Sequence, residues 1–393
     1  MLDGIRIVSF NHFLMGPFGI QHLADMGADV IALEPIGGAW QRKWGGGGRS
    51  VDGQSLLFLC ANRNKRSLSI NLKSPEGKEI AKRLIKSADV VSENYRPGVM
   101  KAFGLDYEAV KAIKPDIVYA SASGYGQTGP YVDRPGQDLL IQAMSGVAAI
   151  TGTKDGARTV GVSAIDHHGA ALLAMGILAG IVRKQRTGQG THVDVSLLQA
   201  AIDLQMESFT CYLNGPKPES NRQPKHIAGW YYGSPYGIYQ ASDAEIVISL
   251  TPLPQLSKVL DSAELAAMDV NDWYSRREEI AALVQKKIAT KTKAEWFDIF
   301  EKNDVWYAPV NDYEAVLADP QVKHNEAFMT IKSATGAPVN LVRHPIRFDG
   351  KGRDVVLPPQ KLGAQTADVL REIGYGDSEI DGFVKAKIVE TVG

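Results

Sequence analysis

Residues 5–34 read IRIVSFNHFLMGPFGIQHLADMGADVIALE, and the fold class can be argued from this stretch. Residues 5–10 are rich in β-branched side chains and predict a strand, and residues 29–34 predict a second strand. Between them, residues 17–26 have the apolar spacing of a helix that ends at Gly27. A strand, a helix and a strand in this order form a βαβ unit, whose strands run parallel. The sequence therefore predicts an α/β fold.

The alternation of strands and helices continues along the chain. Ser74, Pro75 and Glu76 are a helix N-cap, a first-turn proline and a first-turn acid, and they predict a helix that runs to about Lys86. Alternating elements of this kind predict a mostly parallel sheet covered by helices. The further elements expected here are strands at 89–92, 116–121 and 192–195, and helices at 138–149, after Asp166 and up to Gln205.

A second unit is expected after Asn214–Glu219, where proline, glycine and charged residues are concentrated as in a linker. Residues 236–240 and 245–250 predict a β-hairpin, and helical patterns follow to about Pro320. An amphipathic helix is expected at 364–373. We therefore expect a large α/β domain, a small domain and a C-terminal segment, at residues 1–213, 225–325 and 326–393.

The bulk composition disfavours several classes of protein. The chain has 393 residues, of which 44% are hydrophobic, so two domains or lobes are expected. Lys and Arg total 43 against 44 Asp and Glu, without a basic block, so we expect no nucleic-acid partner. The first residues lack the pattern of a secretory signal, which favours a cytoplasmic protein. Cys60 and Cys211 lie in no metal-ligand spacing and are expected to be free thiols.

The most apolar run of the chain is Ala170–Val182. It has 13 residues. A helix needs about 18 to 20 apolar residues to span a bilayer, so this run predicts a buried helix and no membrane partner.

Three motifs occur in a fixed order: Asn94-Tyr95-Arg96-Pro97-Gly98, then Asp166, then RTGQGTHVDVS at residues 186–196. In this order and spacing they resemble the class III CoA-transferase family, whose fold is shared by the α-methylacyl-CoA racemases. The resemblance covers nearly the full length and is strongest over residues 1–205. It implies a Rossmann-like large domain, a smaller α+β domain, a C-terminal segment that returns to the large domain, and two interlinked subunits. It also implies transfer of CoA from an acyl-CoA to a carboxylic acid, with no permanently bound cofactor.

Asp166 stands just before an apolar helix, where an aspartate side chain commonly caps free backbone N–H groups. The resemblance gives it another role, because it matches the family nucleophile that carries an acyl group or CoA covalently. We expect the dipole and free amides of this helix end to keep the carboxylate ionised. A carboxylate that attacks an acyl-CoA forms a mixed anhydride of comparable reactivity. Capping and nucleophilic attack both stay open here.

The resemblance also carries CoA contacts onto specific positions. Leu14 and Met15 precede a helix N-terminus that suits a phosphate, and Lys73 is expected to meet a phosphate as well. Pro35 stands where the family has an arginine, for which Arg42 could substitute, and Lys101 is offset by about one residue from a family basic position. Each of these cations could instead be a solvated surface charge. The expected contacts are Leu14, Met15, Ile70, Asn71, Leu72, Lys73, Asn94, Tyr95, Arg96, Lys101, Gln137 and Asp138.

Gln137 and Asp138 separate two branches of the family. The racemases carry a His-Asp pair at this place for removal of the α-proton, whereas this chain has Gln137. Glutamine cannot act as a general base near neutral pH, which disfavours racemisation by two bases. We expect Gln137 and Asp138 to hold a substrate carboxylate or to position Asp166, and for Asp138 a core or capping role stays open.

Three further motifs concern water exclusion, metal binding and the size of the substrate. Gly45–Gly48 could be a mobile cover that excludes water or a plain flexible loop, and no Gly-Lys-Ser/Thr follows it as in a P-loop. His167 and His168 are adjacent, so on a helix they diverge by about 100° and predict no metal site. Gly229–Gly233 reads GWYYG where formyl-CoA transferases have a glycine-only loop, which favours a different acid of larger size.

Two alternatives from other classes stay open. The βαβ start, with Glu34 at the end of its second strand, could belong to a dinucleotide-binding dehydrogenase, although Gly16 and Gly19 do not complete a GxGxxG motif. A non-catalytic acyl-CoA-binding module would bind CoA without exchanging it. Nicotinamide binding and CoA exchange separate these alternatives from a transferase.

Overall fold

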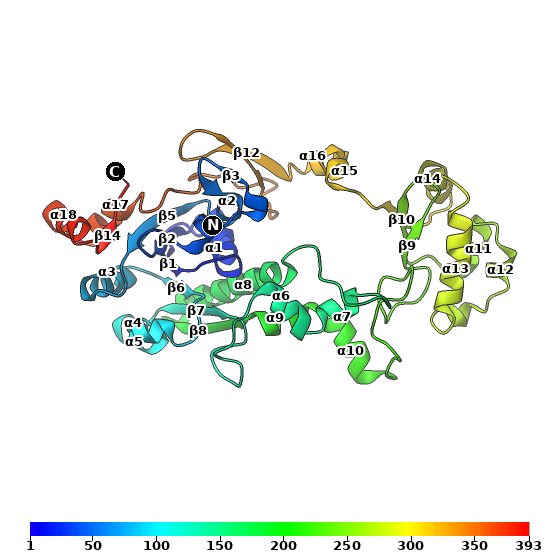
Figure 1. Ribbon diagram of the computed structural model, residues 1–393, viewed down its shortest axis with the longest axis horizontal. Coiled ribbons are helices and arrows are strands. Elements are labelled where there is room, and N and C mark those ends of the chain that lie inside the picture. The colour runs from blue at the N-terminus through cyan, green and yellow to red at the C-terminus, as the bar shows by residue number, and fades with distance from the viewer. Residues whose placement is uncertain (393) are drawn as a thin grey trace. The chain divides into compact units, whose positions relative to one another are not determined.

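The computed structural model describes residues 1–392, which form two compact units (Figure 1). Unit 1 contains residues 1–141, 163–204 and the chain from 323 onward, and unit 2 contains residues 142–162 and 205–322. The expected ranges 1–213, 225–325 and 326–393 differ from these units. Residues 142–162 and 205–213 belong to unit 2, and the C-terminal segment belongs to unit 1.

Unit 1 is built on a seven-stranded sheet in the order β14-β5-β2-β1-β6-β7-β8 (Figure 1). Neighbouring strands run parallel except β14, which pairs antiparallel with β5. This large and mainly parallel sheet confirms the expected α/β fold class. The strands are β1 (Arg6–Phe10), β2 (Asp29–Glu34), β5 (Lys65–Ile70), β6 (Val90–Glu93), β7 (Val118–Ser123), β8 (Thr191–Ser196) and β14 (Val389–Glu390).

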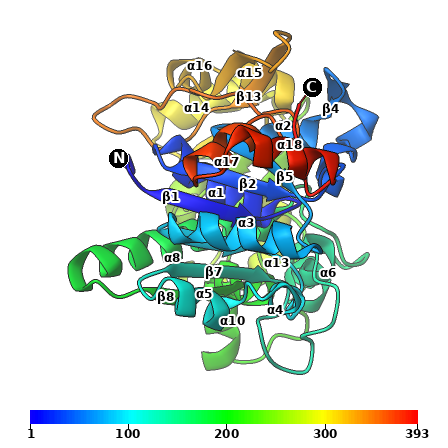
Figure 2. The same ribbon diagram turned by 90° about the vertical axis from the view of Figure 1, so that its left-hand side faces the viewer.

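One face of the sheet is covered by α3 (Pro75–Lys86), α17 (Thr366–Glu372) and α18 (Asp377–Lys385) (Figure 2). Their apolar side chains share one core with alternate strand residues such as Val8 and Ile31. The α3 helix forms as expected, because the Ser74 hydroxyl accepts a hydrogen bond from the Gly77 N–H at 3.0 Å. A cap of this kind stabilises a helix by about 1 kcal/mol.

Two helices cross closely beneath the candidate motifs, α1 (Met15–Asp25) and α8 (Ala164–Thr187). A Cβ added to Gly19 of α1 would lie 2.8 Å from the Ala170 carbonyl oxygen of α8. A Cβ at Gly169 would lie 2.9 Å from the Met15 Cε atom. The two glycines therefore allow the first turns of both helices to touch, which brings the segment after β1 close to the start of α8.

The α8 helix is longer than the apolar run predicted. It has 24 residues, and by length and composition alone it could cross a membrane. Core helices share these properties, and one side of α8 is buried along Ile165, Leu173, Ile177 and Ile181. The helix is longer than the 13-residue run because flanking residues extend it at both ends, and the expected absence of a membrane partner stays a prediction.

Unit 2 has a core of its own around Tyr239, Trp296 and Phe300. The predicted hairpin is confirmed as β9 (Gly237–Gln240) and β10 (Glu245–Ile248), which pair antiparallel. A third strand, β11 (Tyr307–Pro309), pairs with β10. The helices of this part of the chain are α7 (Val147–Thr151), α10 (Met206–Asn214), α11 (Leu253–Val259), α12 (Ala263–Ala266), η3 (Val270–Trp273), α13 (Arg277–Ile288), α14 (Lys293–Lys302), α15 (Tyr313–Ala318) and α16 (Pro320–His324).

Some elements differ from the expectations. The helix expected at 138–149 is divided into α6 (Asp138–Met144) and α7, because Gly146 has a φ of 95° that no right-handed helix accepts. The hairpin of β12 (Phe328–Lys332) and β13 (Pro338–Val342) was not predicted. The remaining elements of unit 1 are η1 (Trp40–Arg42), η2 (Gly46–Gly48), β3 (Ser50–Val51), β4 (Gln54–Ser55), α2 (Leu56–Ala61), α4 (Val99–Phe103), α5 (Tyr107–Ile113) and α9 (Leu197–Leu204).

A steric test of this packing is available at Gly190, before β8. A Cβ there would lie 2.1 Å from the Ile117 carbonyl oxygen, so Gly190→Ala must displace backbone. We expect it to lower the free energy of unfolding by about 1–3 kcal/mol, measured by chemical denaturation. Gly161→Ala is the matched control, because a Cβ there meets nothing within 4 Å. Equal stability of the two variants would contradict this packing.

Candidate active site

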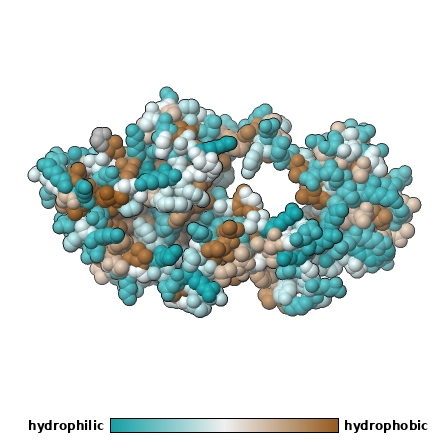
Figure 3. Space-filling view, viewed as in Figure 1, coloured by the Kyte–Doolittle hydropathy of each residue, from teal (hydrophilic) through white to brown (hydrophobic). Residues whose placement is uncertain are grey.

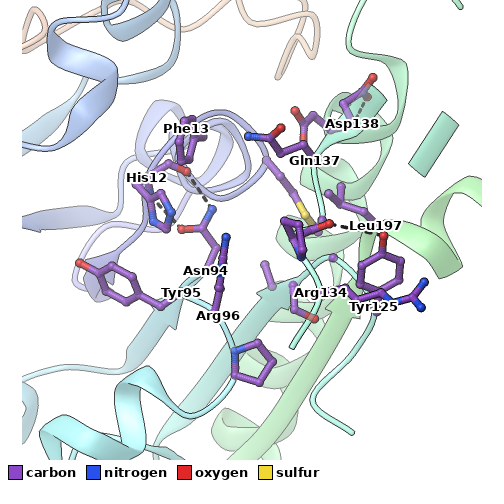
Figure 4. Close-up of a pocket in the computed structure, with 18 of the residues that line it drawn as sticks. His12, Phe13, Asn94, Tyr95, Arg96, Tyr125, Arg134, Gln137, Asp138 and Leu197 are labelled. Carbon is purple, nitrogen blue, oxygen red and sulfur yellow. Dashed lines mark hydrogen bonds between the residues drawn. The ribbon is translucent and has the colours of Figure 1, made fainter. Parts of the chain in front are cut away.

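The candidate site is a cavity of about 430 Å³ within unit 1 (Figure 4). It lies where β1, β6 and β7 end, which is the edge of a parallel sheet at which α/β proteins usually bind ligands. Segments after these strands form its wall together with the start of α8. Its polar and aromatic lining residues include His12, Phe13, Trp40, Trp44, Asn94, Tyr95, Arg96, Tyr125, Arg134, Gln137, Asp138, Ser163 and Asp166.

The N-terminus of α8 is capped by Asp138 and not by Asp166. One Asp138 oxygen, Oδ1, accepts hydrogen bonds from the backbone N–H groups of Ile165 at 2.8 Å and Asp166 at 3.0 Å. These are orphan donors of the first turn of α8, and Ser163 at the N-cap position does not cap with its side chain. Asp138 therefore caps α8 from another segment, and within residues 1–392 the Asp166 carboxylate takes no part in capping this helix.

Two glycines bring Asp138 to this position. A Cβ at Gly124 would lie 2.5 Å from the Cα of Gly136, and a Cβ at Gly136 would lie 2.3 Å from the Cα of Gly124. Side chains at these positions would keep the two backbones apart. The close approach closes the loop after β7 and delivers Gln137 and Asp138 to the start of α8.

The pKa of Asp166 is raised to about 7, first by burial and second by the negative charge of Asp138. This differs from the expectation that the helix end keeps Asp166 fully ionised. The first reason is that the Asp166 carboxyl is buried, and the second is that Asp138, which already occupies amides of the helix terminus, places a like charge beside it. A carboxylate with a raised pKa is a better nucleophile than an ordinary one and is still ionised in a large fraction of molecules near neutral pH.

The motif after β6 is locked onto the segment after β1. The Asn94 side chain accepts from the His12 backbone N–H and donates to the His12 carbonyl oxygen, both at 2.8 Å. The His12 ring packs between Phe13 and Tyr95, with centroids 4.9 and 5.1 Å away. Burial lowers the pKa of His12 to about 4, so its ring is neutral near pH 7. Phe13 has a φ of 60°, a conformation that bulky residues rarely adopt outside functional sites.

A second cavity of unit 1, of about 480 Å³, holds another predicted contact stretch. Ile70, Asn71, Leu72 and Lys73 line it at the carboxyl end of β5. Tyr95 lines both this cavity and the one that holds Asp166. The structure thus brings most of the predicted contacts to two neighbouring cavities joined at Tyr95.

Several predicted contacts lie elsewhere. Leu14 lines neither cavity, and its carbonyl oxygen accepts the Phe18 N–H at the start of α1, whereas Met15 lines the first cavity. Lys101 lines a third cavity, of about 260 Å³, which shares Arg96 with the first. Arg42 forms hydrogen bonds of 2.5 and 2.6 Å to Glu34, so its guanidinium is engaged within the protein.

Sequence reasoning missed Arg134 and Tyr125, which line the first cavity from the loop after β7. Their position just beyond the carboxyl end of a predicted strand was the available signal. The two histidines after Asp166 have separate contacts, since His168 Nε2 lies 2.8 Å from Asp203 and the His167 ring packs on Phe18. Within residues 1–392, no group of three or more His, Cys, Asp or Glu side chains is arranged to hold a metal ion.

Comparisons with known proteins identify the family of the chain. Residues 2–366 match the model of CoA-transferase family III. The chain is 33% identical over 401 residues to human succinyl-CoA:glutarate CoA-transferase, covering 99% of this chain and 90% of that protein. It is also 33% identical over 391 residues to acetyl-CoA:oxalate CoA-transferase of Acetobacter aceti, covering 96% and 97% of the two chains.

Solved structures share the fold. A CAIB/BAIF family protein from Brucella suis superposes with a TM-score of 0.80 at 31% identity, covering 95% of this chain and 99% of that one. Rv3272 from Mycobacterium tuberculosis superposes with a TM-score of 0.80 at 26% identity, covering 94% and 98%. The chain therefore belongs to CoA-transferase family III and is a CoA-transferase of that family.

Proposed function

We propose that this CoA-transferase works through a covalent intermediate on Asp166. The observation that carries the proposal is the different use of two neighbouring carboxylates. Asp138 caps α8 with its oxygen, while Asp166 lines the cavity and makes no capping bond. Asp166 can therefore react without uncapping the helix that positions it.

The transfer proceeds in four displacements. Ionised Asp166 attacks the thioester carbonyl of the acyl-CoA, the C–S bond breaks, CoA leaves as a thiolate, and a mixed anhydride between Asp166 and the acyl group remains. The thiolate attacks the aspartyl carbonyl, which releases the donor acid and leaves an aspartyl-CoA thioester. The acceptor carboxylate attacks this thioester and again displaces the thiolate. The thiolate then attacks the acceptor carbonyl, which frees acyl-CoA product and Asp166 without net proton transfer.

The anhydride must be shielded from water during these steps. Phe13, Trp40 and Trp44 line the cavity, with ring centroids 5.3 Å apart between Phe13 and Trp40 and 4.9 Å apart between Trp40 and Trp44. In the proposed mechanism these stacked rings form the apolar wall over the acyl group. They stand next to the glycine-rich segment Gly45–Gly48, whose proposed role is to let this wall adjust to a bound substrate.

CoA has a long chain, and two cavities joined at one residue suit its length. We assign the nucleotide end of CoA to the cavity lined by Asn71 and Lys73, and the thiol end to the cavity of Asp166. Tyr95 lines both cavities and would contact the pantetheine arm between them. Lys73 is the cation offered to the phosphates, whereas Arg96 lines the cavity assigned to the thiol end.

A dicarboxylic acceptor acid is supported by the names of the relatives and by Arg134. The relatives described above are named for glutarate and oxalate. Arg134 lines the Asp166 cavity with its guanidinium 4.1 Å from the Tyr131 ring centroid, and within residues 1–392 it forms no ion pair with an acid. One carboxylate of the acceptor attacks the thioester, and Arg134 is placed to bind the other.

The racemase alternative lacks a second base. Gln137 lines the cavity where a base would be needed, and glutamine accepts no proton near neutral pH. His12 also lines the cavity, and its backbone is hydrogen-bonded to the Asn94 side chain on the segment after β6. Enzyme-dependent uptake of deuterium at the α-carbon of a 2-methylacyl-CoA would favour the racemase instead.

We further propose that the chain functions as a homodimer and not in a membrane. Large apolar side chains of unit 1 are exposed on α8 and α9, among them Met175 at 61%, Val182 at 46% and Leu204 at 46%. Figure 3 shows hydrophobic groups in separate places among hydrophilic ones, rather than one continuous apolar belt, on the face in view. A second copy of the chain is the proposed cover. Light scattering that gives a monomer mass at micromolar concentration would contradict it.

Covalent catalysis predicts an adduct on Asp166. Incubation with an acyl-CoA and no acceptor should leave an acyl or CoA group on the peptide that holds Asp166, detected by mass spectrometry and removed by hydroxylamine. Asp166→Asn should retain the fold and lose CoA exchange by at least about 10³-fold, since it keeps the size and removes the nucleophile. If this variant exchanged CoA at the wild-type rate, with deamidation excluded, Asp166 would not be the nucleophile.

The raised pKa of Asp166 predicts a pH dependence. Only the ionised carboxylate attacks, so kcat should fall as pH drops through about 7. Asp138→Asn keeps an oxygen for the two N–H groups but removes the like charge, so it should move the midpoint of the kcat profile to lower pH. Asp133→Asn, an exposed acid on the same loop, is the control. An unmoved midpoint in Asp138→Asn would contradict the coupling of the two carboxylates.

Arg134 predicts acceptor selectivity. Arg134→Gln should raise KM for a dicarboxylic acceptor such as glutarate by about tenfold or more, the effect of losing a charge-assisted hydrogen bond, and leave KM for a monocarboxylic acid of equal length unchanged. Arg49→Gln changes an exposed arginine outside the cavity and serves as control. Equal effects on both acids would remove Arg134 from acceptor recognition.

A further inference from the structure

A third cavity, of about 260 Å³, lies on the other side of the Arg96 segment, within unit 1. Arg96 and Pro97 line both this cavity and the one that holds Asp166. The mechanism proposed above uses none of its remaining residues. Among them is a buried acid, Glu93, which is the last residue of β6 and is 4% exposed.

Strand register places a polar row beside Glu93. Glu93 is opposite Ser121 on β7, and Ser121 is opposite Asp194 on β8. Side chains at paired positions of adjacent strands lie next to each other on the same face. His192, two residues before Asp194, shares this face, and its Nε2 lies 3.0 Å from the Ser121 Oγ. Ser121 stands between the two, since it is also the strand partner of Glu93. A chain of neighbouring polar side chains therefore runs from Glu93 through Ser121 to His192.

The outer end of this chain is fixed by packing. The His192 ring stacks on Tyr107 with centroids 4.6 Å apart and an interplanar angle of 19°. Tyr119 meets the same ring edge-on at 5.6 Å, and its hydroxyl donates to the Leu105 carbonyl oxygen at 2.9 Å. His192 is thus held on two sides, and its Nε2 atom fixes Ser121, the strand partner of Glu93.

The inner end of the chain holds the motif that faces the candidate active site. Glu93 Oε2 accepts a hydrogen bond from the Tyr95 backbone N–H at 3.0 Å. Tyr95 lines both proposed CoA cavities, Asn94 locks the segment after β1, and Arg96 borders the Asp166 cavity. One buried acceptor thus fixes the backbone at the centre of this motif.

We propose that Glu93 is a positioning residue that holds the Asn94–Pro97 segment in the conformation that binds acyl-CoA. The inference rests on the proposed function, because it concerns the same cavities. It assigns to Glu93 no contact with substrate. Its effect is exerted through the Tyr95 backbone, and so it concerns the KM for acyl-CoA rather than the chemistry at Asp166.

The protonation state of Glu93 sets how the positioning of the Asn94–Pro97 segment depends on pH. Burial raises the pKa of Glu93 to about 7, with the charge of Asp194 adding to the effect. Around its cavity the cations are Arg96 and Lys101, and the other acids are Asp106 and Glu108. The other titratable side chains there are Tyr107, Tyr119 and His192. Within residues 1–392, no lysine or arginine nitrogen forms an ion pair with the Glu93 carboxyl.

Because the pKa of Glu93 is raised, protonation of its carboxyl stabilises the buried position of this side chain. The stabilisation is complete below the ordinary pKa of glutamate, and it is lost as pH rises through about 7. Ionisation then favours a more solvated position for Glu93, and the Tyr95 segment loosens. The KM for acyl-CoA should therefore increase as pH rises from 6 to 8, by up to about tenfold, which is one pKa unit of proton linkage.

Three variants test the proposal by steady-state kinetics and by hydrogen–deuterium exchange of the peptide that holds Tyr95. Glu93→Ala removes the acceptor, so it should raise KM by about tenfold, leave kcat within about twofold, and speed exchange of this peptide. Glu93→Gln imitates the protonated acid, so it should keep the wild-type KM of low pH and make KM independent of pH. Glu108→Gln, an exposed acid of the same cavity, should match the wild type throughout.

The outcomes separate this inference from the proposed function. The role of Glu93 would be overturned if Glu93→Gln and Glu93→Ala kept the wild-type KM, the wild-type pH dependence of KM and the wild-type amide exchange. This holds even if CoA exchange is confirmed. If Glu93→Ala does not fold, a KM of Glu93→Gln that still follows pH like the wild type would overturn it. If the wild type shows no CoA exchange, the proposed function fails, and faster amide exchange at Tyr95 in Glu93→Ala still supports the positioning role.

Discussion

The candidate active site depends on the two hydrogen bonds between the Asp138 Oδ1 atom and the first amides of α8. A buried helix terminus needs acceptors for its orphan N–H groups. Because Asp138 supplies them from a neighbouring loop, the aspartate on the helix itself need not. The same bonds fix the loop after β7, which carries Arg134 and Gln137, against the helix that carries Asp166. One capping interaction thus assembles both sides of the cavity.

Two carboxylates of the same type acquire different roles from their surroundings. Asp138 accepts two amide hydrogen bonds and caps α8, whereas Asp166 makes no such bond and burial, together with the charge of Asp138, raises its pKa to about 7. Glu93 is a third acid with a pKa raised to about 7, and its carboxyl acts on backbone instead of substrate. Burial is the first cause of the raised pKa in both Asp166 and Glu93.

Short sequence patterns predicted the elements whose formation depends on neighbouring residues of the chain. The strand at 29–34 and the helix capped by Ser74 were predicted from propensity and caps, and both form as expected. Strand β5 and the antiparallel edge strand β14 were not predicted, because β14 is two residues long and its pairing joins distant parts of the chain. The family motifs indicated Asp166 and Tyr95. The sequence left a capping role open for Asp138 but could not indicate that the capped helix is α8, since this depends on the contact of Gly124 with Gly136, which only the folded backbone shows.

The central claim, that Asp166 reacts covalently with the acceptor, is tested most directly by oxygen tracing. In the proposed sequence the acceptor carboxylate loses one oxygen to the enzyme when the thiolate attacks the acceptor carbonyl. After turnover with an acceptor acid labelled with oxygen-18, the Asp166 peptide should therefore carry the heavy isotope in its carboxylate, and the same peptide of the Asp166→Asn variant should not. A fully active enzyme whose Asp166 peptide stays unlabelled, while the product acyl-CoA forms, would contradict the account.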